Sequence, residues 1–106
     1  MKKINVGLIG FGTVGSGVVK ILREKKAFLS EKIGLEINIK KICDKDISTK
    51  RGSVSIDKSL LTRNARDIID DPGIDIVLEL MGGIHPAKEF IAEALNKGKN
   101  VVTANK

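Results

Sequence analysis

Three glycines near the amino terminus have the spacing of a phosphate-binding loop. Positions 10–15 read G-F-G-T-V-G, a G-x-G-x-x-G motif. Gly10 would permit a tight turn, Gly12 would let the backbone approach a pyrophosphate, and Gly15 would let a helix pack closely on a strand. The free N–H groups and the positive end of such a helix attract phosphate. The motif therefore predicts a dinucleotide-phosphate site, with an ordinary strand–helix turn as the alternative.

The segments on either side of the motif are those that such a loop requires. Residues 4–9, I-N-V-G-L-I, form a short apolar run that is typical of a buried parallel strand. After the motif the apolar spacing becomes helical, and we expect one helix that runs to about Ser30 and fades near Gly34. Its apolar stripe comprises Val14, Val18, Val19, Ile21 and Leu22. Gly17 lies outside the motif, and we expect it to serve close packing.

The remaining sequence continues to alternate between strand and helix. We expect a second strand ending at Ile42-Cys43, a loop with one irregular turn over 46–63, a short helix over 65–69, a strand over 74–80, a helix from Pro86 to Gly98 and a strand over 100–103. Within the last helix, Glu93 and Lys97 should form an i,i+4 ion pair. This order predicts an α/β fold, namely a doubly wound parallel sheet of the Rossmann type with helices packed on its faces.

The carboxyl ends of parallel strands meet at one edge of the sheet, where ligands bind. Positions 10–15, 81–85 and 103–106 should therefore converge. The middle segment begins with Met81-Gly82-Gly83, and two glycines there would let the backbone come close to a ribose or a ring. A turn that needs positive φ explains the same two glycines.

The second strand should end beside the adenosine ribose, where the choice between NAD and NADP is made. Asp44 follows this strand, and a carboxylate there accepts a hydrogen bond from the 2′-hydroxyl of NAD. Its distance from Gly15 exceeds the usual spacing of about 20 residues, which a long first helix can absorb. Lys45, Lys50 and Arg51 favour the opposite choice, because each could pair with the 2′-phosphate of NADP. We expect both cofactors to bind, with NADP at least as tight.

Composition limits the classes of protein to which the chain can belong. The 106 residues are 42% hydrophobic and 30% charged, which fits one globular domain. One cysteine excludes an internal disulfide, and no apolar run reaches the roughly 18–20 residues that span a bilayer. We therefore expect a cytoplasmic location and no membrane partner. The net charge of +6 is dispersed and Trp and Tyr are missing, so we expect no nucleic-acid partner.

Two residue types that often carry chemistry have an ordinary interpretation here. Cys43 has no evident partner base, so we interpret it as a small buried residue. His85 is the single histidine, and we interpret it as a surface residue near the binding edge. We expect no metal site.

Three segments resemble homoserine dehydrogenases, in the same order along the chain. They are residues 7–17 (GLIGFGTVGSG), 75–88 (DIVLELMGGIHPAK) and 101–106 (VVTANK). The similarity covers nearly the whole chain, and residues 47–64 contribute least. The resemblance implies the cofactor-binding part of an NAD(P)-dependent enzyme that interconverts L-homoserine and L-aspartate 4-semialdehyde, in threonine, methionine and isoleucine biosynthesis.

The resemblance also implies roles for particular residues. Phe11, Thr13 and Val14 would line the pyrophosphate and nicotinamide side of the cofactor. Thr103 and Lys106 would lie beside the nicotinamide and the substrate, with Lys106 as a catalytic residue. An ammonium there can hydrogen-bond the oxygen that becomes negative during hydride transfer. It can also help to move the proton if burial lowers its pKa.

Members of this family continue beyond the position of Lys106 through a substrate and dimerisation domain. We therefore expect residues 1–106 to be a truncated cofactor-binding domain that is inactive alone. The small-molecule substrate and the homo-oligomer would require the missing domain. A non-catalytic nucleotide-sensing domain is the alternative function, because it shares the glycine loop, but it does not account for the segment 103–106.

Overall fold

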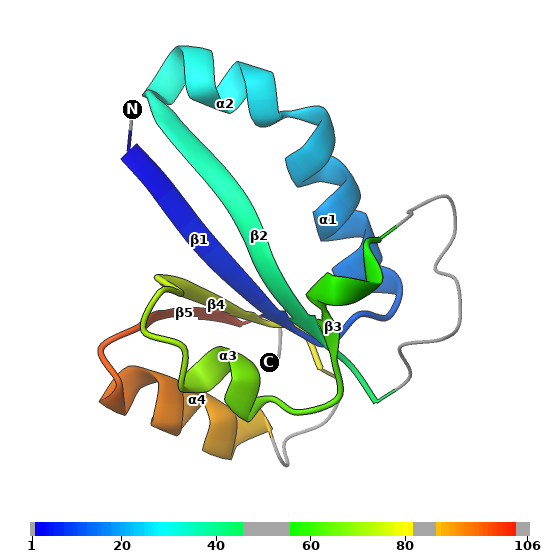
Figure 1. Cartoon of the computed structure of the whole chain (residues 1–106), viewed down its shortest axis with the longest axis vertical. Helices are drawn as coiled ribbons and strands as arrows, with labels where there is room; N and C mark the ends of the chain where they lie inside the picture. Colours follow the sequence, from blue (N-terminus) through cyan, green and yellow to red (C-terminus); the bar gives the residue numbers. More distant parts are fainter. Residues whose placement is uncertain (1, 46–55, 82–86, 104–106) are drawn as a thin grey trace.

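Five parallel strands form one sheet in the order β3-β2-β1-β4-β5 (Figure 1). The computed structural model describes residues 2–45, 56–81 and 87–103. Its elements are β1 (Lys2–Ile9), α1 (Thr13–Glu24), α2 (Lys26–Ile33), β2 (Leu35–Cys43), η1 (Lys58–Leu60), β3 (Leu61–Thr62), α3 (Arg66–Ile69), β4 (Ile76–Glu79), α4 (Ala87–Asn96) and β5 (Asn100–Thr103). Helices α1 and α2 lie on one face of the sheet, and α3 and α4 lie on the other. The predicted doubly wound parallel sheet is confirmed.

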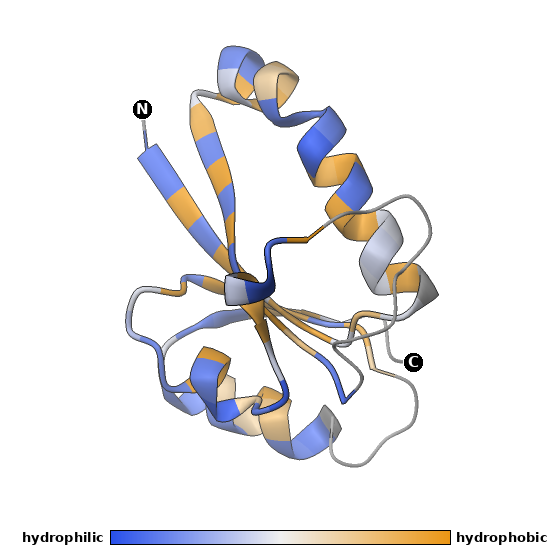
Figure 2. Ribbon diagram, turned by 45° about the vertical axis from the view of Figure 1, so that its right-hand side comes forward, coloured by the Kyte–Doolittle hydropathy of each residue, from blue (hydrophilic) through white to orange (hydrophobic). Residues whose placement is uncertain are grey.

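The hydrophobic core lies toward the carboxyl ends of the strands. In β1 the first two lysines are exposed, whereas the last four residues, Val6 to Ile9, are buried. Figure 2 agrees with this difference in burial, because hydrophilic and hydrophobic residues alternate along the amino-terminal parts of β1 and β2. One buried cluster joins Leu8 to Val19 of α1, and the other joins Ile9 to Ile68 of α3. The two clusters fix both layers of helices against the carboxyl half of the sheet.

The predicted first helix is in fact two helices that are broken at Lys25. A straight helix over 13–33 would be about 31 Å long. The eight-residue strand β1 spans only about 26 Å, so one straight helix would be longer than the strand beside which the chain returns. The break lets the chain reach the start of β2 through Gly34, whose φ of 73° ends α2.

Several of the other local predictions are confirmed and three are wrong. The short helix, the strand before position 80, the helix ending near Gly98 and the last strand all occur as predicted. The predicted loop over 46–63 is wrong at Leu61–Thr62, which form β3, whereas η1 fits the single irregular turn expected there. Gly17 does not serve close packing, because a Cβ there would meet nothing within 4 Å.

The predicted ion pair within α4 is the third wrong prediction. Glu93 pairs instead with Arg66 of α3, and Lys97 lies 3.6 Å from Asp70 at the end of α3. Helix α3 packs beside α4, so it presents opposite charges to both side chains. Within 2–45, 56–81 and 87–103, no helix is long and apolar enough to cross a membrane.

Candidate dinucleotide-binding site

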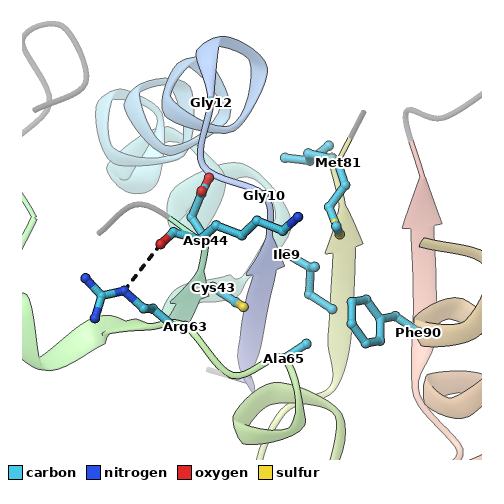
Figure 3. Close-up of a pocket in the computed structure, with 11 residues that line it drawn as sticks. Ile9, Gly10, Gly12, Cys43, Asp44, Arg63, Ala65, Met81 and Phe90 are labelled. Atoms are coloured by element: carbon cyan, nitrogen blue, oxygen red, sulfur yellow. Dashed lines mark hydrogen bonds between the residues drawn. The ribbon is translucent and has the colours of Figure 1, made fainter. Parts of the chain in front are cut away.

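A pocket of about 390 Å³ opens at the carboxyl edge of the sheet (Figure 3). Its apolar lining consists of Ile9, Cys43, Ala65, Leu80, Met81 and Phe90. Its polar lining consists of Gly10, Gly12, Asp44, Lys45 and Arg63. The pocket thus gathers residues that follow β1, β2, β3 and β4, together with one residue of α4. This is the edge at which open α/β sheets bind ligands.

The glycine loop joins β1 to α1, and its three glycines have different surroundings. Gly10 has φ of 106°, and a Cβ there would lie 2.8 Å from the backbone carbon of Leu80. A Cβ at Gly15 would overlap the carbonyl oxygen of Gly10, so α1 packs directly on the turn. A Cβ at Gly12 would meet nothing within 4 Å. Gly10 and Gly15 must therefore be glycine because a side chain there would strike the protein's own backbone. Gly12 instead leaves open space beside the pocket.

Helix α1 begins at this open position without a side-chain cap. Gly12 is its N-cap residue, and the first turn carries no acidic side chain. The first N–H groups of a helix have no partner within the helix, and its amino end carries a partial positive charge. The start of α1 can therefore receive an anionic group from the pocket, which is the arrangement that a pyrophosphate requires.

Asp44 connects the end of β2 to the glycine loop. Its Oδ2 atom accepts a hydrogen bond of 2.6 Å from the backbone N–H of Phe11. The carboxylate is half-buried and lines the pocket. Asp44 thus lies where a ribose-binding acid is expected, and it also holds the loop that precedes α1.

Arg63 is a pocket residue that the sequence did not reveal. It follows β3, which pairs with β2 through Leu61 and Thr62. Its Nε atom donates a hydrogen bond of 3.3 Å to the carbonyl oxygen of Lys45, as Figure 3 shows. Two basic residues therefore flank the Asp44 side of the pocket. The sequence did not indicate Arg63 because the strand before it has only two residues, which is too short to recognise by periodicity.

Cys43 forms part of the apolar lining and is not an activated nucleophile. Burial raises the pKa of its thiol to about 11, and the negative charges of Asp44 and Asp67 act in the same direction. The neutral thiol therefore predominates near neutral pH. This agrees with the interpretation of Cys43 as a small buried residue.

Thr103 and Met81 are connected by the carboxylate of Glu79, which the sequence alone indicates only as part of a strand. Glu79 is fully buried, and its Oε1 atom accepts a hydrogen bond of 2.6 Å from the Thr103 hydroxyl. Its Oε2 atom accepts another, 2.8 Å long, from the backbone N–H of Met81. The ends of β4 and β5 are therefore joined at the edge where Thr103 was expected.

The other predicted site residues fall into two groups. The side chain of Phe11 is buried in the core cluster on the α1 side, so only its backbone faces the loop. Val14 is exposed on the first turn of α1, and Thr13 begins that helix. The remaining predicted residues lie outside the described residues: Lys50, Arg51, Gly82, Gly83, His85 and Lys106.

The strand order, the glycine loop between β1 and α1 and the polar pocket at the carboxyl edge together define a Rossmann-type dinucleotide-binding domain. Residues 10–106 match the family model described as "Homoserine dehydrogenase, NAD binding domain". The chain belongs to this family, and its cofactor is NAD(P).

Individual relatives agree with the family model. The chain is 47% identical over 106 residues to a homoserine dehydrogenase of Bacillus subtilis and 42% identical over 106 residues to one of Methylobacillus glycogenes. These matches cover 100% of this chain but only 24% and 26% of the relatives. The chain therefore spans about a quarter of their length.

Solved structures show the same relationship. A crystal structure of S. aureus homoserine dehydrogenase at pH 6.0 aligns with a TM-score of 0.92 and 43% identity, over 99% of this chain and 27% of that one. The structure from Thiobacillus denitrificans aligns with a TM-score of 0.85 and 40% identity, over 99% of this chain and 24% of that one. The fold and the sequence thus point to the same family.

Proposed function

We propose that the chain is the cofactor-binding part of an enzyme that interconverts L-homoserine and L-aspartate 4-semialdehyde with NAD(P). The observation that carries this proposal is the open backbone at Gly12, which adjoins both the uncapped start of α1 and the pocket. Relatives named homoserine dehydrogenase supply the substrate and the reaction. The pathways to threonine, methionine and isoleucine follow from that reaction.

The fold indicates how the dinucleotide would lie. A dinucleotide crosses the sheet where the strand order reverses, and here that point lies between β1 and β4. The pyrophosphate would rest on the backbone of Gly12 and the start of α1. The adenosine half would lie toward β2 and β3, beside Asp44, and the nicotinamide half toward β4 and β5, beside Met81 and Thr103. We propose that Gly82 and Gly83 let the backbone approach this half closely.

The chemistry is a hydride transfer coupled to a proton transfer. In the oxidative direction, the alcohol carbon of the substrate gives a hydride to the cofactor and its hydroxyl loses a proton. We propose that Lys106 hydrogen-bonds the oxygen on which negative charge develops, since a fixed cation there lowers the barrier. The Thr103 hydroxyl would help to define this edge, because it is held by Glu79.

The adenosine end offers groups that suit either cofactor. The carboxylate of Asp44 can accept from a 2′-hydroxyl, while Lys45 and Arg63 can pair with a 2′-phosphate. The two basic side chains are exposed, so each can turn toward the ligand without being freed from a buried contact. We propose that both cofactors bind and that NADP binds at least as tightly as NAD.

The remaining parts of the proposal rest on the relatives. Because the chain spans about a quarter of their length, we propose that a substrate-binding domain completes the enzyme and supports a homo-oligomer in the cytoplasm. The nucleotide-sensing alternative is not retained, because the family model and the relatives described above are dehydrogenases.

A titration tests the proposal directly. NADPH, NADH, ATP and a DNA oligomer are added separately to the protein, and binding is followed by calorimetry. We expect both dinucleotides to bind, ATP to bind more weakly and the DNA not to saturate. Binding of ATP alone would contradict the assignment, because it would favour a mononucleotide sensor. Homoserine-dependent reduction of NADP⁺ by the full-length protein tests the substrate.

A further inference from the structure

The last row of the sheet carries a buried carboxyl group next to the pocket. One residue from each strand contributes to this row through the strand register: Thr62, Cys43, Ile9, Glu79 and Thr103. Register partners in parallel strands point to the same face, and Ile9 and Cys43 from this row line the pocket. Glu79 is therefore the next residue of this row on the same face, on the side of β4 and β5; it is buried behind the pocket, whose lining includes its neighbours Leu80 and Met81.

Glu79 is an acid that accepts hydrogen bonds at both of its carboxyl oxygens. Its side chain is 0% exposed and accepts hydrogen bonds from the Thr103 hydroxyl and the Met81 N–H, at 2.6 and 2.8 Å. In the part of the chain that the structure describes, no lysine or arginine forms an ion pair with it. Hydrogen bonds accepted by both oxygens favour the carboxylate form, and a buried charge is weakly screened, so its field extends into the adjacent pocket.

The two redox forms of the cofactor differ in charge at the end of the site where Glu79 lies. The nicotinamide ring is a cation when oxidised and neutral when reduced. The reversal of strand order between β1 and β4 directs this ring toward β4 and β5. We propose that Glu79 biases the site toward the oxidised cofactor, by attracting the cationic ring relative to the neutral one. This inference rests on the proposed function.

A purely structural role for Glu79 is the competing explanation, and one substitution separates the two. In Glu79→Gln, the amide oxygen can still accept from the Met81 N–H, and the amide NH₂ can donate to the Thr103 hydroxyl oxygen. The link between β4 and β5 is therefore retained while the charge is removed. Glu79→Met removes the charge with an apolar side chain of similar length, and so serves if the glutamine variant does not fold.

The experiment measures the affinities of NADP⁺ and NADPH for the full-length protein and its variants at one pH. In Glu79→Gln, we expect NADP⁺ to bind about 3- to 10-fold more weakly, with NADPH changed less than about twofold. Glu79→Asp keeps the charge, so the ratio of the NADP⁺ affinity to the NADPH affinity should stay close to that of wild type. Glu31→Gln removes an exposed charge from α2 and should change neither affinity.

The adenosine fragment 2′,5′-ADP separates failure of this inference from failure of the proposed function. It lacks the nicotinamide, so its affinity should be the same in wild type and in Glu79→Gln. If both dinucleotides and the fragment bind but the NADP⁺ to NADPH ratio is unchanged in Glu79→Gln and Glu79→Met, the electrostatic bias is wrong and the binding site stands. If none of the three compounds binds the wild-type protein, both proposals are overturned.

Discussion

Replacing Gly12 with valine should separate cofactor binding from folding. The structure leaves open space at this position and φ is −85°, so only ψ of −148°, just outside the extended region that valine favours, should cost stability, by about 1 kcal/mol. The new side chain would occupy the space that the pyrophosphate needs. Each hydrogen bond to a charged group contributes about 1.5–3 kcal/mol, so losing two should weaken binding by at least about 100-fold.

Two other glycines of the same segment provide the controls. Gly17→Val also introduces a side chain into open space, but on α1 and away from the pocket, so binding and stability should both be retained. Gly10→Val forces valine into φ of 106° and against Leu80, which should cost at least about 2 kcal/mol of stability. Calorimetric titration with NADPH and unfolding in urea measure the two effects. Unchanged affinity in Gly12→Val would refute the assignment of the phosphate loop.

Three further predictions concern the pocket and its surroundings. Arg63→Ala should weaken NADPH binding by roughly tenfold and NADH binding by less than about twofold, because only NADPH carries the 2′-phosphate. Lys58→Ala removes the same charge from η1 and should change neither affinity; equal losses for both cofactors in Arg63→Ala would contradict this role. The Cys43 pKa rises from the usual 9.0 to about 11 on folding, so its contribution to stability is complete below pH 9 and is lost as the pH rises through about 11. Between pH 8 and 11, the free energy of unfolding should therefore fall more steeply with rising pH in wild type than in Cys43→Ala. The same pH dependence in both proteins would exclude this linkage. A protein made of residues 1–106 alone should not turn over homoserine, whereas the full-length protein should; turnover by the short protein would show that no further domain is required.

The main elements of the fold were predictable because their apolar patterns are uninterrupted. The run over 4–9 and the helical spacing after Gly10 determine β1 and α1, and the turn residues before Gly73 mark the start of β4. Strand β3 has only two residues and shows no period, so its place beside β2 depends on tertiary packing. The break at Lys25 has no glycine or proline to announce it, because it results from the length of β1 rather than from local preference.

The glycines of the candidate site could be placed from the sequence, but the side chains that surround them could not. The motif spacing alone assigned different tasks to Gly10 and Gly12, and the surroundings of the two residues differ accordingly. Arg63 reaches the pocket only because β3 pairs with β2. Glu79 lies in an apolar strand, and its significance depends on Thr103, which is 24 residues away in sequence and adjacent in the sheet. Contacts of this kind have no local signature.

The position of β1 makes the stability of the sheet dependent on what fills the pocket. The sheet has two halves, β3-β2-β1 and β4-β5. They are hydrogen-bonded to each other along one short seam, where Val6–Ile9 of β1 pair with Ile76–Glu79 of β4. The pocket lies over the end of this seam, with Asp44 on one side and Met81 on the other. A ligand that contacts both sides would act as a cross-link, and at 100 times its Kd it would add about 2.7 kcal/mol to the stability. Hydrogen exchange of the amides along the seam would then slow as the free ligand concentration rises, so the supply of cofactor in the cell would set how often the sheet opens.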